Sequence, residues 1–74
     1  VIWTNKGVAL AGLFRYAEAI DAFDMALSLD PDDAAALHNK GISLSRIGRD
    51  SEAMEVMERA RKVSTTRSPG KKIW

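Results

Sequence analysis

An internal repeat with a period of 34 residues constrains the fold of this 74-residue chain more than any other feature. The tripeptide Asn-Lys-Gly at residues 5–7 recurs at residues 39–41, and Glu-Ala at residues 18–19 recurs at residues 52–53. A period of roughly 20–50 residues is typical of solenoid proteins, whose units bury their apolar faces only against neighbouring units. We therefore interpret the chain as two copies of one unit. Further identical pairs are Leu10 and Leu44, Arg15 and Arg49, and Ala26 and Ala60.

Each unit is predicted to consist of two helices joined by a short turn. Apolar residues recur every three or four positions, which is the periodicity of an amphipathic helix. Pro31 cannot continue a helix, and Gly48 suits a helix end because it adopts positive φ easily. Short turns place consecutive helices antiparallel, so the sequence predicts an all-α fold of antiparallel helix-turn-helix pairs. The expected helices span residues 1–13, 16–29, 34–47 and 51–63.

Small residues recur on the apolar side of the expected helices. Such residues allow the backbones of two packed helices to come close, so we interpret them as packing positions. Ala19 is expected to face the first helix at the gap that Gly7 leaves. Ala26 is expected to approach Leu37 or Gly41 of the second unit.

Both units resemble the tetratricopeptide repeat, a pair of helices with a characteristic set of small and large residues. In the first unit the residues at these positions are Trp3, Gly7, Leu10, Tyr16, Ala19, Phe23, Ala26 and Pro31. In the second unit they are Leu37, Gly41, Leu44, Ala53, Met57 and Ala60. The resemblance covers residues 1–63 and implies a short right-handed α-solenoid. Repeat 1 would then span residues 1–33, repeat 2 residues 34–63, and a basic tail or linker residues 64–74.

Three features of the sequence depart from the family pattern. Lys6 and Lys40 stand before the glycine of each repeat, where the family usually carries leucine. Phe14 takes the turn position that Gly48 holds in repeat 2, so the first turn is expected to be strained or to differ in shape. Thr65 replaces the proline expected after repeat 2, which leaves the end of the last helix undefined.

No catalytic or metal-binding pattern is present in the sequence. The chain has no cysteine and a single histidine, His38, so neither a thiolate nor a histidine-built metal site is expected. Phosphate-binding loops and zinc-protease motifs are also absent from the sequence. We interpret the helical carboxylates as a solvated surface. The sequence therefore predicts a protein that is not an enzyme and that needs no metal and no cofactor.

The sequence contains no signal for membrane insertion or secretion. No apolar run approaches the roughly 20 residues that a membrane-spanning helix needs, and no signal-peptide pattern opens the sequence. Together with the absence of cysteine, this favours a cytoplasmic location and no membrane partner. Because the sequence begins with Val1 rather than methionine, we expect it to be a fragment of a longer protein.

The resemblance implies that the first helices of the repeats line a concave wall that binds a partner peptide or helix. Asn5 and Asn39 occupy equivalent positions, and their amides can either bond to the backbone of an extended peptide or simply bind water. The variant of the family that clamps a C-terminal carboxylate is disfavoured, because Thr4 and Val8 replace its lysine and asparagine. The expected partner-binding positions, which we call the inner face, are Thr4, Asn5, Val8, Gly12, Ala35, His38, Asn39, Ile42 and Arg46.

The last helix of repeat 2 has no following helix pair within this sequence to cover it. Solenoid proteins usually need three or more repeats to bury their apolar faces. We therefore expect either self-assembly with another chain, or a tail that folds back so that Ile73 and Trp74 cover the last helix. The expected self-association positions, which we call the C-terminal edge, are Met54, Met57, Ala60 and Val63.

The basic residues are concentrated at the end of the sequence. Residues 59–74 contain six of the 11 basic residues and no acidic residue, which leaves five basic against ten acidic residues in residues 1–58. A basic tail could follow a phosphate backbone while Trp74 stacks on a base, so nucleic acid is a minor alternative partner. The acidic body disfavours this alternative. A protein or peptide is the expected partner, with a homo-oligomer as the alternative.

Overall fold

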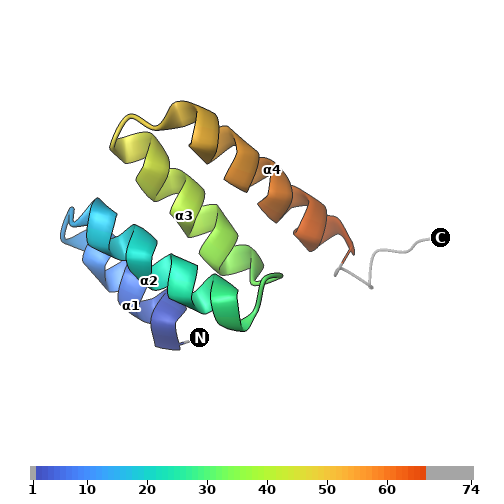
Figure 1. Cartoon of the computed structure of the whole chain (residues 1–74), viewed down its shortest axis with the longest axis horizontal. Helices are drawn as coiled ribbons and strands as arrows, with labels where there is room; N and C mark the ends of the chain where they lie inside the picture. Colours follow the sequence, from blue (N-terminus) through green and yellow to red (C-terminus); the bar gives the residue numbers. More distant parts are fainter. Residues whose placement is uncertain (1, 67–74) are drawn as a thin grey trace.

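The computed structural model describes the backbone of residues 2–66 and the side chains of residues 2–63. Within this range the chain forms four α-helices and no strand, and the helices follow one another in chain order across the molecule (Figure 1). Their bounds are α1 Ile2–Gly12, α2 Tyr16–Leu29, α3 Ala34–Arg46 and α4 Asp50–Thr66. The predicted all-α fold of two helix pairs is therefore confirmed.

The helix bounds agree with the sequence prediction except at the ends. Helix α2 has the predicted bounds, whereas α1 and α3 each end one residue earlier than predicted. Helix α4 begins one residue earlier than predicted and continues three residues past Val63, so it enters the segment that we expected to be tail. The reason is that residues 64–66 contain neither glycine nor proline, the residues that end helices most strongly. Val1 lies outside the described residues.

Helix α2 is the central element of the stack. Consecutive helices pack against each other, and α1 also contacts α3. Because α2 lies between α1 and α3, it buries residues on two sides, whereas a terminal helix buries them on one. Its buried residues are Ala19, Ile20, Ala22, Phe23 and Ala26.

Each repeat places a glycine of its first helix against a large side chain of its second helix. A Cβ atom at Gly7 would lie 2.7 Å from Cδ1 of Phe23, and one at Gly41 would lie 2.6 Å from Cγ of Met57. Phe23 is fully buried beneath Gly7. We had predicted that Ala19 would lie at the gap that Gly7 leaves. The side chain at this gap is that of Phe23, because the longer side chain reaches across the helix pair.

The two repeats meet at a pair of alanines. Ala26 of α2 belongs to the same buried cluster as Ala36 of α3, the residue before the predicted contact Leu37. Two methyl side chains at this crossing allow the two helix backbones to approach closely. A second buried cluster contains Ile20 of α2 and Leu44 of α3, so apolar contacts connect the repeats at two positions along these helices.

The turns within the two repeats have the same conformation. After α1, the N–H of Arg15 donates to the carbonyl of Leu10 at 2.9 Å, and after α3 the N–H of Arg49 donates to that of Leu44 at 2.9 Å. This hydrogen bond, donated by the second residue after the C-cap, defines a Schellman motif. The motif needs a residue in the left-handed conformation directly after the C-cap. Phe14 has φ 62° and Gly48 has φ 85°. The first turn therefore keeps its shape and is strained, the first of our two alternatives.

Candidate functional site

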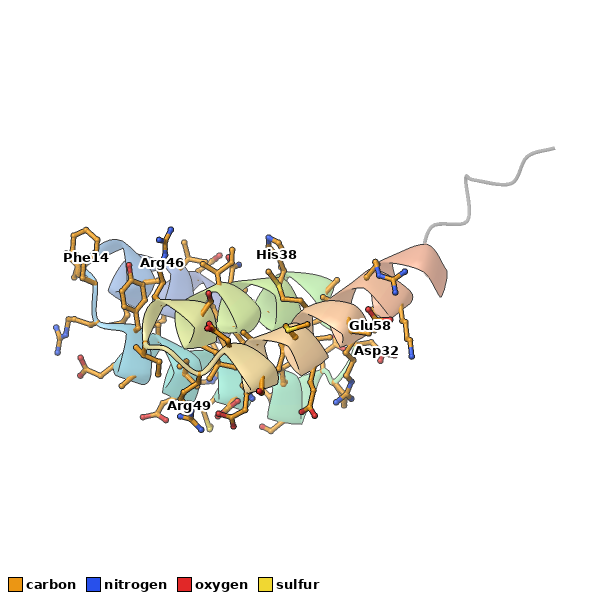
Figure 2. The ribbon with its side chains drawn as sticks, turned by 90° about the horizontal axis from the view of Figure 1, so that it is seen from above. Phe14, Asp32, His38, Arg46, Arg49 and Glu58 are labelled. Carbon is orange, nitrogen blue, oxygen red and sulfur yellow. The ribbon has the colours of Figure 1, made fainter. Side chains whose placement is uncertain are left out.

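The inner face lies along one side of α1 and α3. Figure 2 shows His38 and Arg46 pointing to this side of the helical layer, whereas Arg49 points to the opposite side. Asn5 and Val8 of α1 are exposed on it. The structure therefore leaves most of the inner face accessible, including side chains from both repeats. The exposed residues of the inner face are Asn5, Val8, Gly12, Ala35, His38 and Arg46, and the half-buried ones are Asn39 and Ile42.

Thr4 does not belong to the accessible part of the inner face. Its relative exposure is 7%, and its hydroxyl donates a hydrogen bond of 2.8 Å to Oδ2 of Asp33. The prediction that Thr4 contacts a partner was therefore wrong. The physical reason is that the start of α3 covers this position in repeat 1, whereas within the described residues nothing covers its counterpart His38, which is exposed.

Asp33 joins the two repeats by accepting two hydrogen bonds. Its Oδ1 accepts from the N–H of Ala36 at 3.0 Å, which caps the N-terminus of α3, and its Oδ2 accepts from Thr4 of α1. Burial alone would raise the pKa of Asp33, but the hydrogen bonds from Ala36 and Thr4 stabilise the carboxylate and hold its pKa below the ordinary value of 3.8. Asp33 thus fixes the relative position of α1 and α3, which together carry the inner face.

Asn5 and Asn39 present unused amides on the inner face. Neither side chain forms a hydrogen bond with another residue in the part of the chain that the structure describes. Each amide can donate through its nitrogen and accept through its oxygen. The two residues are equivalent by the repeat, so they offer the same pair of groups at successive steps of the solenoid.

The α3 side of the inner face combines an apolar residue with two basic ones. His38, Ile42 and Arg46 are spaced by four residues, which places them in one row along a helix. At 1.5 Å per residue, His38 and Arg46 stand about 12 Å apart along the helix axis. Arg46 is the one residue of the inner face with a fixed charge. The row can therefore contact an apolar group and a carboxylate of the same ligand.

The C-terminal edge is less apolar than the sequence suggested. Met54 is 72% exposed, whereas Met57 and Val63 are half-buried. Ala60 is only 6% exposed and packs inward, so its assignment to an exposed edge was wrong. Ala60 is the counterpart of Ala26, and the small residue at this position is buried in both repeats.

An open groove runs beside the C-terminal edge between α3 and α4. It has a volume of about 510 Å³. Gly41 forms its floor from α3, and Ala53, Met54 and Met57 line it from α4. Glu58 and Arg61 add an ion pair at its rim. A smaller hollow nearby contains His38, Ala60 and Arg61 among its lining residues.

Three further ion pairs on the surface, like that of Glu58 with Arg61, were not predicted from the sequence. Arg15 and Arg49 each form a paired contact with the glutamate three residues later, with Nη2 donating to Oε2 at 2.9 Å in both repeats. The hydrogen bonds that Arg49 donates to Glu52, together with the negative charge of Glu52, raise the pKa of Arg49. The recurrence of both the arginine and the glutamate at the repeat period was the signal that could have revealed these pairs.

The third ion pair crosses the junction between the repeats. Nζ of Lys40 on α3 lies 2.6 Å from Oδ1 of Asp24 on α2. Its counterpart Lys6 has no preceding helix within the described residues and lies over the ring of Trp3, with Nζ 5.2 Å from the ring centroid. The lysine at this unusual position is therefore a junction residue in repeat 2.

The described residues contain no group of three or more histidine, cysteine or acidic side chains placed to hold a metal ion. None of the helices in residues 2–66 is long and apolar enough to cross a membrane. The predictions for the end of the tail concern Arg67, Lys71, Lys72, Ile73 and Trp74, which lie outside the described residues.

Comparison with known protein families agrees with the repeat geometry. Two family profiles, each described as tetratricopeptide repeat, match residues 1–33 and residues 22–55. The chain belongs to the tetratricopeptide repeat family. Tetratricopeptide repeats serve in general as scaffolds for protein–protein interaction, and this function is the one that the family supports for the present chain.

A comparison with individual proteins found a relative of similar sequence. The chain is 40% identical over 55 residues to a protein of Candida albicans described as a peroxisomal targeting signal receptor. The match covers 74% of this chain and 9% of the length of that relative. The chain thus spans only a small part of the length of that relative.

Proposed function

We propose that this chain is a non-enzymatic scaffold that binds a peptide or a helix of a partner protein on the inner face of α1 and α3. The observation that carries the proposal is the pair of unused amides of Asn5 and Asn39, which project from equivalent positions of the two repeats. An amide can donate to a peptide carbonyl and accept from a peptide N–H, so two amides at successive steps favour an extended backbone.

The inner face also limits the chemistry of the partner. Val8 and Ile42 offer apolar contact, and Arg46 offers a single fixed positive charge. We expect the partner segment to carry apolar side chains and an acidic group near the C-terminal end of α3. The relative from Candida albicans is described as a receptor for a targeting signal, which supports a peptide as the class of partner.

Peptide binding with amide variants tests this proposal. Fluorescent peptides selected on a peptide array with the wild-type chain are titrated by anisotropy against Asn5→Ala, Asn39→Ala and Glu55→Ala, a matched control on the exposed surface of α4. Each lost hydrogen bond is expected to weaken binding by about threefold to tenfold. The control should bind like the wild type. Unchanged binding by both asparagine variants would reject the inner face as the site.

A second candidate function is self-assembly through the C-terminal edge. The specific observation is Met54, which is 72% exposed although its counterpart in repeat 1, Ile20, is 8% exposed. An exposed methionine beside an open apolar groove favours docking of another helix. The two candidates use different residues and do not exclude each other.

A further inference from the structure

The turn between α1 and α2 carries an aromatic side chain that the fold does not require. Phe14 has φ 62°, a left-handed conformation that strains a residue with a bulky side chain, and it is 78% exposed. Gly48 makes the same turn in repeat 2 without that strain. Burial therefore does not explain why an aromatic residue occupies this turn. Residues held in strained backbone conformations cluster at ligand-binding and active sites.

A neighbouring repeat leaves this turn uncovered, as the two repeats show for each other. Repeat 1 precedes Gly48, yet a Cβ atom there would meet no heavy atom of the described residues within 4 Å apart from its chain neighbours. Repeat 2 follows Leu13 and Phe14, which are both exposed. A unit packed before α1 in the same way would leave Phe14 as open as repeat 1 leaves Gly48. The exposure of the ring is therefore a property of the turn itself.

Arg46 is open in the same way at the end of α3. Its counterpart Gly12 is followed by repeat 2, and a Cβ atom at Gly12 would also meet nothing within 4 Å among the described residues beyond its own helix. Arg46 is exposed although repeat 1 precedes it. Its guanidinium forms no ion pair or hydrogen bond within residues 2–63. The N–H groups of Arg46 are therefore available to bind a carboxylate.

Phe14 and Arg46 lie at the same end of the inner face. Figure 2 shows both side chains at the end of the helical layer where the turns lie, on the side to which His38 points. Helices α1 and α3 run in the same direction and contact each other (Figure 1), so their C-terminal ends are neighbours. An exposed ring and an unpaired guanidinium thus stand next to each other beyond the two helix ends.

From this arrangement we propose that Phe14 and Arg46 form a subsite for a partner peptide that carries an aromatic and an acidic residue separated by one position. The ring of the peptide packs on Phe14, and its carboxylate accepts hydrogen bonds from the guanidinium of Arg46. The inference rests on the proposed function. It names the chemistry of the partner and adds Phe14, which is not one of the predicted inner-face positions, as a contact residue.

The contact between Phe14 and Tyr16 favours an aromatic ring over an aliphatic side chain in the ligand. Their rings meet edge to face, with centroids 6.1 Å apart and planes at 71°. Ring pairs in this geometry are favourable beyond the area that they bury. The contact positions the ring of Phe14 before a ligand binds, and a positioned side chain loses less freedom on binding. A third ring can therefore extend the pair.

The spacing of the two ligand groups follows from the spacing of the helices. Two packed helices lie about 8–10 Å apart. In an extended peptide, side chains two positions apart project to the same side and stand about 7 Å apart. A phenylalanine and a glutamate at this spacing can therefore reach Phe14 and Arg46 together. The amides of Asn5 and Asn39 are left to bond to the peptide backbone farther along the helices.

Three fluorescein-labelled peptides test the subsite on the whole chain by anisotropy. Each consists of alanine and serine around a central Glu-Ser-Phe-Ser-Glu, Glu-Ser-Leu-Ser-Glu or Gln-Ser-Phe-Ser-Gln, and the first offers the aromatic and acidic pair in both chain directions. The wild type should bind the first peptide about twofold to tenfold more tightly than the leucine peptide. It should bind the first peptide about tenfold or more tightly than the glutamine peptide.

Variants of the chain assign each preference to its residue. Phe14→Gly should abolish the preference for phenylalanine over leucine, although it relieves the strain of the turn and so keeps the chain folded. Arg46→Gln should abolish the preference for glutamate over glutamine. Leu29→Ala and Arg49→Gln are the matched controls, because Leu29 is exposed at the other end of α2 and Arg49 points to the opposite side in Figure 2. Both controls should keep the preferences of the wild type.

The peptide preferences separate this subsite from the rest of the inner face. Equal affinity of the wild type for the three peptides, or no measurable binding of the first, overturns the aromatic and acidic subsite. Preferences that Phe14→Gly and Arg46→Gln leave unchanged overturn its location. None of these results affects the amide test, which uses array-selected peptides with Asn5→Ala and Asn39→Ala. Failure of the amide test with intact peptide preferences would reject the amides and keep the subsite.

Discussion

At the scale of single residues, the same backbone conformation carries two different side chains. Phe14 and Gly48 both adopt positive φ in equivalent Schellman turns. A side chain in this conformation costs about 1–2 kcal/mol, whereas glycine adopts it freely. The sequence showed that Phe14 stands where repeat 2 has glycine, but it could not decide between strain and a different turn. The hydrogen bonds of the turn decide for strain, because they require the left-handed residue.

We expect Phe14→Gly to stabilise the fold by about 0.5–1 kcal/mol, because it removes the backbone strain. The gain is reduced because the change also removes the edge contact between the rings of Phe14 and Tyr16, whose centroids lie 6.1 Å apart. The reciprocal change Gly48→Ala should destabilise the fold by about 1 kcal/mol. Chemical denaturation of the wild type, these two variants and Phe14→Ala measures both effects. Stabilisation by Gly48→Ala, or loss of stability in Phe14→Gly beyond that of Phe14→Ala, would contradict this assignment of strain.

At the scale of helices, the sequence predicted the elements well but not the contacts between them. Helical periodicity shows which side of a helix is apolar, whereas the angle at which helices cross decides which side chain fills which gap. For this reason Gly7 was correctly identified as a gap, but its occupant Phe23 was not. The burial of Thr4 was missed for the same reason, because it depends on where the start of α3 lies.

The cap of α3 makes the stability of the stack depend on pH. Because the folded state lowers the pKa of Asp33 below 3.8, its contribution is fully present above that value and is lost as pH falls through the folded pKa. Asn is an equally good cap but does not titrate. The stability advantage of the wild type over Asp33→Asn should therefore shrink below pH 3.8. Asp33→Ala should cost about 1 kcal/mol at neutral pH.

Denaturation of the three chains from neutral to acidic pH measures this dependence, and carbon NMR of the Asp33 carboxyl gives its pKa directly. Thr4→Val serves as the control for the second hydrogen bond and should move the pKa of Asp33 back towards its ordinary value. A constant difference between wild type and Asp33→Asn across the acidic range would show that Asp33 titrates alike in the folded and unfolded states.

At the scale of the whole molecule, the repeat explains both the fold and the candidate surfaces. The sequence period was sufficient to predict two stacked helix pairs and to place most of the inner face. It could not show that Lys40 bridges the repeats through Asp24, since each residue alone reads as a solvated charge.

The measurement that tests the central claim most directly is a map of peptide binding on the folded chain. An array-selected peptide is titrated into the isotopically labelled protein, at a concentration where sedimentation reports a monomer, and the amide and side-chain NMR signals are followed. We predict that the largest changes fall on Asn5, Val8, Asn39 and Ile42, from both repeats at once. Changes confined to Met54 and Met57, or to the outer side of α2, would contradict the inner face as the binding site.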